Sequence, residues 1–104
     1  MAKFVLAYHG GGMPETEAEQ AEVMAAWGNW FSGLGEAVLD GGNPVAMAKT
    51  VASDGSVSDG GGANPLSGYS LLQADSLDAA IEMAKGCPIL ASGGSIEVCQ
   101  AIDM

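Results

Sequence analysis

The chain contains no arginine and only three lysines, against thirteen aspartates and glutamates, so its formal net charge at pH 7 is −10. Nucleic-acid binding requires many cationic side chains to neutralise phosphates, and binding to an anionic membrane surface requires a basic patch. We therefore expect neither nucleic acid nor a membrane as a partner. Because no guanidinium group can grip a phosphate or carboxylate with two parallel hydrogen bonds, strongly anionic ligands are disfavoured as well.

Cysteine is also scarce, since Cys87 and Cys99 are the only two, with no C-x-x-C spacing and no histidine near either. We expect no zinc site, no thioredoxin-type motif and two reduced thiols. The first residues lack the apolar region of a signal peptide, and no apolar run approaches the roughly 18 residues of a membrane span. These observations predict a cytoplasmic protein.

The 104 residues are 48% apolar, which is typical of one folded domain spanning residues 1–104. Strands are predicted at 4–8, 37–39, 68–74 and 95–102, and helices from Pro14 to about 34 and from about 76 to 85. A small hairpin is predicted at 49–58, with a type I′ turn at Asp54-Gly55. Two strand-helix-strand halves of this size predict a ferredoxin-like α+β sandwich, with both helices on one face of a four-stranded antiparallel sheet.

The other face of this predicted sheet has no helix to cover it. Alternation along the strands places apolar side chains there: Tyr69, Leu71, Cys99 and either Phe4, Leu6 and Tyr8 or Val5 and Ala7. Such a face is too apolar to be left in water, and a second copy offers a self-complementary cover. We therefore predict a homodimer closed by this face.

Four glycine clusters are predicted to meet at one end of the sheet, at residues 10–12, 41–42, 60–62 and 93–94. His9, Asp40 and Asp59 lie at the same end. Two interpretations are open: the clusters form the mouth of a small-molecule pocket, or they are four tight turns. None matches a nucleotide-binding motif or a serine-hydrolase elbow, so we expect no cofactor.

His9 is the only histidine, and its side chain is the natural general acid or base near neutral pH. The candidate catalytic set is His9 with Asp59 or Asp40 to orient it, while the alternative is a histidine that caps the end of the strand. Either Trp27 or Trp30 lines a pocket or dimer edge, or both pack on the core. The candidate ligand-binding residues are Tyr8, Gly10, Gly11, Gly60, Gly61, Trp27 and Tyr69.

Six segments together resemble the YCII-related superfamily, in particular its members with an Asp-Gly-Pro-Phe signature. The segments are residues 4–8, 41–44, 58–60, 67–69, 75–80 and 94–98. The resemblance implies a dimeric α+β barrel. Asp59-Gly60 matches the start of the signature, but Gly61 and Gly62 replace its proline and phenylalanine.

Relatives with a proposed enzymatic role resemble lactone isomerases and a dehydrochlorinase, and they use a histidine on the first helix. Here that region has Met24 and Trp27 and no histidine, so the family's His-Asp pair does not transfer. Two function classes follow. One is acid-base chemistry on a small carbonyl or lactone-like compound in a glycine-lined pocket. The other is a non-catalytic ligand-binding or regulatory module, and the sequence does not decide between them.

Overall fold

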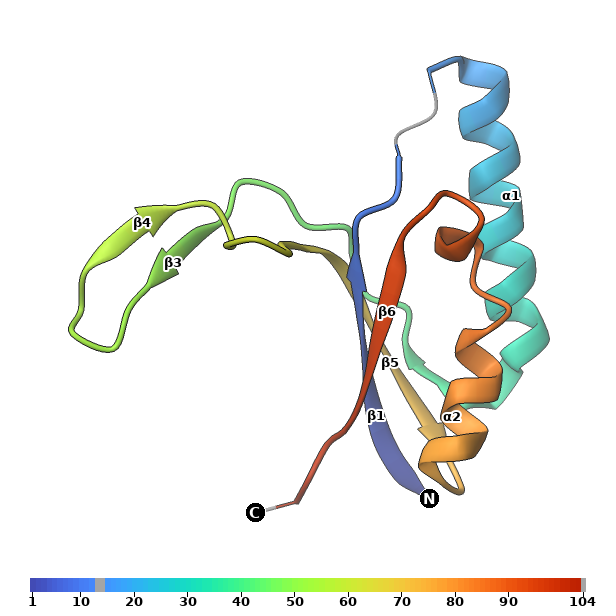
Figure 1. Ribbon diagram of the computed structural model, residues 1–104. Helices are drawn as coiled ribbons and strands as arrows, with labels where there is room; N and C mark the ends of the chain where they lie inside the picture. Colours follow the sequence, from blue (N-terminus) through green and yellow to red (C-terminus); the bar gives the residue numbers. More distant parts are fainter. Residues whose placement is uncertain (13–14, 104) are drawn as a thin grey trace.

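The fold is a four-stranded antiparallel sheet with both helices on one face, as seen in a computed structural model that describes residues 1–12 and 15–103 (Figure 1). The strand order is β2-β5-β1-β6. The strands are β1 (Ala2–His9), β2 (Val38–Asp40), β5 (Leu66–Ala74) and β6 (Ser95–Gln100), and the helices are α1 (Glu17–Leu34) and α2 (Leu77–Ala84). This confirms the predicted ferredoxin-like α+β fold.

Side-chain caps fix where both helices begin. The Thr16 hydroxyl accepts a hydrogen bond from the Glu19 backbone N–H at 3.1 Å, and the acidic first turn of α1 suits the helix dipole. Ser76 caps α2 in the same way, by accepting from the Ala79 N–H at 3.1 Å. Pro14, the predicted start of the first helix, lies outside the described residues.

Three local predictions are wrong. The second strand was expected to begin at Ala37, but Ala37 belongs to a 3-10 turn, Gly35–Ala37. The last strand ends at Gln100, two residues early. The hairpin turn is not type I′, because only Gly55, at φ 88°, has a positive φ there. Asp54 stays on the negative side, and its carboxylate accepts from the Ser56 N–H at 2.9 Å.

The core lies between the sheet and the helices. Alternate residues of β1 and β5 are buried there, among them Phe4, Leu6, Tyr8, Ser70, Leu72 and Ala74. Trp27 packs edge-on against Tyr8 with ring centroids 5.2 Å apart, and the Trp30 indole donates to the Met83 carbonyl at 3.0 Å. Even so, no described residue of the 18-residue helix α1 is fully buried.

The register settles which β1 residues lie on the uncovered face. Val5 pairs with Leu71 and Cys99, and Ala7 pairs with Tyr69 and Glu97, so these side chains share one face. Phe4, Leu6 and Tyr8 face the helices instead. A separate two-stranded hairpin, β3 (Lys49–Val51) with β4 (Val57–Asp59), extends away from the sheet on the side opposite the helices (Figure 1).

Candidate functional site

His9 ends β1 at the end of the sheet where the glycines at 10–12 and 93–94 pack together. β1 and β5 shift register between Tyr8 and His9, so that Tyr8 pairs with Gly68 but His9 pairs with Leu66. A bulge of this kind redirects the side chain beside it. The imidazole Nδ1 consequently lies 3.1 Å from the Asn64 carbonyl oxygen and 3.2 Å from that of Pro65.

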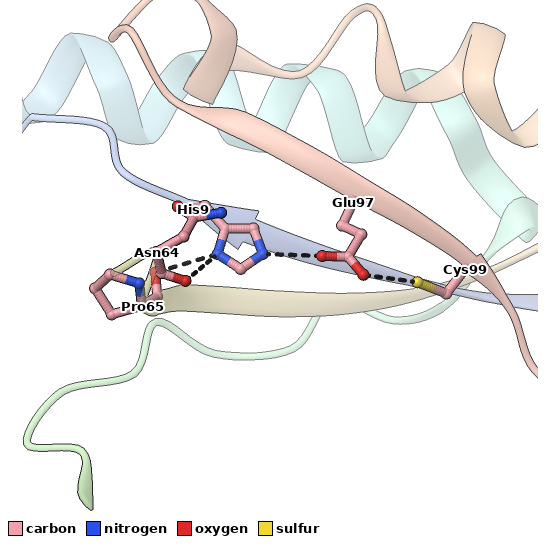
Figure 2. Close-up of polar contacts among 5 residues, drawn as sticks. All are labelled: His9, Asn64, Pro65, Glu97 and Cys99. Atoms are coloured by element: carbon pink, nitrogen blue, oxygen red, sulfur yellow. Dashed lines mark hydrogen bonds and ion pairs between the residues drawn. The ribbon is translucent and has the colours of Figure 1, made fainter. Parts of the chain in front are cut away.

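Glu97 provides the carboxylate beside His9. In the β1/β6 ladder His9 pairs with Ser95 and Ala7 with Glu97, which makes Glu97 the diagonal neighbour of His9 on the uncovered face. Its Oε1 lies 3.5 Å from His9 Nε2, and its Oε2 lies 3.6 Å from the Cys99 sulfur, which donates to it (Figure 2). His9, Glu97 and Cys99 therefore form a row of polar groups beside the apolar centre of that face.

The surroundings of the ring determine which nitrogen carries the proton. Backbone carbonyls and a carboxylate only accept hydrogen bonds, so both ring nitrogens face acceptors. The two carbonyls lie 3.1 and 3.2 Å from Nδ1, closer than Glu97 Oε1 lies to Nε2 at 3.5 Å, and they make Nδ1 the N–H donor of the neutral ring. In the neutral ring Nε2 then has a lone pair and no proton. Nε2 is shielded from solvent and has no hydrogen-bond partner among the described residues, although the carboxylate stands beside it. A proton arriving at Nε2 would convert this contact into an ion pair.

Neither thiol is poised to act as a nucleophile. Desolvation and the neighbouring Glu97 carboxylate raise the pKa of Cys99 above its ordinary value, so its thiol stays protonated and donates. Burial raises the pKa of the Cys87 thiol to about 11. Both cysteines are free. The chemistry available on this face is proton transfer at the imidazole.

Within the chain, the two carboxylates expected to orient His9, Asp59 and Asp40, have other partners. The Asp59 carboxylate is engaged by Lys49, whose Nζ donates to it at 2.8 Å on the exposed hairpin. Asp40 accepts from the Gly42 backbone N–H at 2.8 Å and so closes its own loop. Sequence reasoning missed Glu97 because its nearness to His9 depends on the β1/β6 register. The signal that could have found it is strand alternation, which puts Glu97 on the same face as Cys99.

The expected ligand-binding residues do not line one space. Tyr8 is buried on the helix side, where its hydroxyl donates to Ser70 Oγ at 2.7 Å, and Trp27 packs against it. Tyr69 lies on the opposite face, and its hydroxyl accepts from the Asn43 amide at 3.2 Å. Gly60 donates its N–H to the Ala48 carbonyl at the root of the hairpin.

The glycines at 10–12, 41–42 and 93–94 lie at one end of the sheet, as the topology predicts, while those at 60–62 belong to the loop that flanks the hairpin. Close packing near His9 involves the backbone and the Ile89 side chain. A Cβ on Gly94 would lie 2.8 Å from the His9 carbonyl oxygen and 3.0 Å from the Gly11 nitrogen. Gly10 faces the Gly94 backbone, and Gly61 faces Pro65. This supports the interpretation of tight turns for these glycines.

Two shallow hollows in the described part of the chain lie away from His9. One lies between α2 and β6 and is lined by Ile81, Ala84, Lys85, Leu90, Ile96 and Val98. The other lies beside the two chain ends. Among residues 1–12 and 15–103, no group of three or more His, Cys, Asp or Glu residues could hold a metal ion. Within the same residues, no helix has the length and apolar character to cross a membrane.

Residues 4–104 match the family model of the YCII-related domain. This match covers nearly the whole chain, so the chain belongs to the YCII-related family. No curated protein matches the chain.

Proposed function

We propose that this YCII-related protein performs acid-base chemistry on a small, weakly charged carbonyl or lactone-like compound, with His9 as the base. The observation that carries the proposal is which nitrogen of the His9 ring carries the proton. Two loop carbonyls hold Nδ1 as a donor, which leaves the Nε2 lone pair directed at Glu97. A fixed tautomer of this kind is what a general base needs.

In the proposed reaction Nε2 takes a proton from the carbon next to the substrate carbonyl and returns it to another atom of the same compound. The step is an isomerisation, so no oxidant or reductant is consumed. Glu97 is 66% exposed at its side chain, so its carboxylate can swing aside to admit the substrate and then stabilise the imidazolium. The net charge of −10 and the lack of arginine favour a substrate with little negative charge.

A homodimer closed by the uncovered face is part of this proposal. Val5, Ala7, Tyr69 and Leu71 make the centre of that face apolar, and His9 and Glu97 stand at its end. A second copy would exclude water above the imidazole and strengthen its interaction with the carboxylate. The two free thiols suit a reducing compartment, and we therefore propose the cytoplasm as the location.

The test is exchange of carbon-bound protons in heavy water, followed by proton NMR over a panel of small ketones and lactones. We expect the parent protein to accelerate exchange, and His9→Gln to lower the rate by about 100-fold or more, because a positioned base contributes that much. Glu97→Gln should lower it less. Glu82→Gln, which changes a carboxylate paired with Lys85 on α2, is the matched control and should leave the rate unchanged.

A second candidate is a non-catalytic ligand-binding or regulatory module. The burial of Nε2 and the position of both hollows away from His9 favour it. A compound of the panel that perturbs the signals of His9 and Glu97 without any proton exchange would support this module and contradict the enzyme.

A further inference from the structure

The segment 45–62, here called the arm, consists of the β3–β4 hairpin and its two flanking loops. It projects on the same side of the sheet as the uncovered face (Figure 1). Every residue of the arm is exposed, and its two strands pair only with each other. A two-stranded hairpin with no further support is marginally stable in water. The arm therefore requires a surface that its own chain does not offer.

One side of the arm carries an exposed apolar pair, next to the Lys49–Asp59 ion pair that alternation places on the same side. Val51 and Val57 are paired directly across the hairpin and are 69% and 60% exposed. Thr50 and Ser58 form the next pair, and alternation places them on the opposite side. Met47 stands at the root with a fully exposed side chain and a positive φ of 56°, a backbone conformation that an L residue seldom adopts. These features are typical of a contact surface.

The side of the molecule that carries the arm and the uncovered face has little net charge. Lys49 is neutralised by Asp59 on the arm, and Lys3 offsets Glu97 on the face, which leaves Asp54 as the one uncompensated carboxylate of the arm. The acidic first turn of α1 lies on the other side of the sheet. Each copy has a net charge of −10, so two copies repel each other least when these sides face one another.

The exposed area is large enough for such an interface. The chain exposes 6972 Å², whereas a compact monomer of this mass exposes about 5,400 Å². Its radius of gyration of 15.0 Å likewise exceeds the roughly 13 Å of a compact domain of about 100 residues. The surplus of about 1,600 Å² per chain would supply an interface in the range of obligate homodimers.

We propose that the arm clasps a second copy of the chain, packing its Val51 and Val57 side against that copy while the two uncovered faces meet. The inference rests on the homodimer proposed above. A two-fold axis lets both copies use face and arm at once, which closes the assembly. Asn64 and Pro65, whose carbonyls orient His9, follow just after the arm, so docking of the arm also fixes the site.

The test combines sedimentation equilibrium with hydrogen exchange of the full chain. Val51→Thr with Val57→Thr keeps shape and strand propensity but replaces a methyl with a hydroxyl on the contact side. We expect this variant to weaken the dimer by at least about tenfold, because two buried methyl groups are lost from each copy. Thr50→Ser with Ser58→Thr, on the opposite side of the same strands, is the control and should leave the dissociation constant unchanged.

In the parent protein, the amides of β3 and β4 should exchange slowly at concentrations where it is dimeric and fast after dilution, while β1 and β5 stay protected. If the valine variant kept the dissociation constant of the parent, and hydrogen exchange in the arm did not depend on concentration, the docking of the arm would be contradicted. The proposed dimer would not be affected by that result. A parent protein that is monomeric at every concentration would contradict both the docking of the arm and the homodimer of the proposed function, while proton exchange would still test the role of His9 separately.

Discussion

Two buried ionisable groups, the Tyr8 phenol and the Cys87 thiol, make the stability of the protein sensitive to alkaline pH. Burial raises the pKa of both, that of Cys87 from its ordinary value near 9 to about 11. Below pH 9 each group is protonated in the folded and the unfolded chain. Above it, the unfolded thiol ionises while the folded one stays neutral, so the unfolded state gains stability as the pH rises.

We therefore predict that the free energy of unfolding falls between pH 9 and pH 11, by about 2–3 kcal/mol from Cys87 alone. Urea unfolding followed by tryptophan fluorescence measures it. Cys87→Ala should be less stable at neutral pH, because it leaves a small cavity, but should show a shallower fall. The same steepness in parent and variant would show that the thiol does not carry the effect.

The contrast between His9 and its carboxylate indicates what a sequence can reveal about a single residue. His9 was identifiable because it is the only imidazole and ends a strand. Its partner was not, because thirteen carboxylates are present and only the pairing of strands far apart in the chain decides which of them is near. Asp59 was a reasonable candidate from topology, yet its neighbour across the hairpin is Lys49.

Gly42 lies in the turn that follows β2. This position tolerates an added side chain far less well than Gly28 inside α1. Its φ is +74°, and a Cβ there would run into the Tyr69 carbonyl. We predict that Gly42→Ala lowers the free energy of unfolding by at least about 3 kcal/mol, since backbone on both sides must shift. Chemical denaturation at one fixed protein concentration is the measurement.

Gly28→Ala is the matched control for Gly42→Ala. Gly28 lies inside α1, and an added Cβ would meet nothing within 4 Å. Alanine there should raise stability by up to about 1 kcal/mol, because glycine is the poorer helix former. If both variants were equally stable, the close approach of Gly42 to the Tyr69 carbonyl would not be a feature of the folded protein.

The elements themselves were largely predictable, because local chemistry specifies them. The helix caps and the alternation in β5 are local signals, and the structure follows them. One error falls where non-local pairing decides, at the last strand, which ends at Gln100. The 3-10 turn Pro88–Leu90 was not predicted, although Pro88 and Gly86 marked a break in the chain there.

As a whole, the molecule has one strongly acidic side and one nearly neutral apolar side, which predicts how salt acts on assembly. Two copies of net charge −10 repel each other at long range, and added salt screens that repulsion. We predict that the dimer tightens as sodium chloride is raised from low to physiological concentration. Sedimentation equilibrium in a salt series measures this, and a dimer that weakens with salt would indicate an interface held by ion pairs.

Leu71→Glu tests the uncovered face directly. Leu71 pairs with Val5 at the centre of that face, and a carboxylate there would be buried without a partner in the dimer. We predict a folded monomer, with an unchanged far-ultraviolet circular dichroism spectrum and half the sedimenting mass. A dimer that survives this substitution would place the interface elsewhere.

The most direct test of the account is the protonation of His9, read from its two ring nitrogens in a proton-nitrogen NMR correlation spectrum. No other imidazole is present, so the signals need no separation. At a pH where the ring is neutral, we predict a protonated Nδ1, held by the Asn64 and Pro65 carbonyls, and an unprotonated Nε2 facing Glu97. A proton found on Nε2 instead would contradict the geometry on which the proposed base depends.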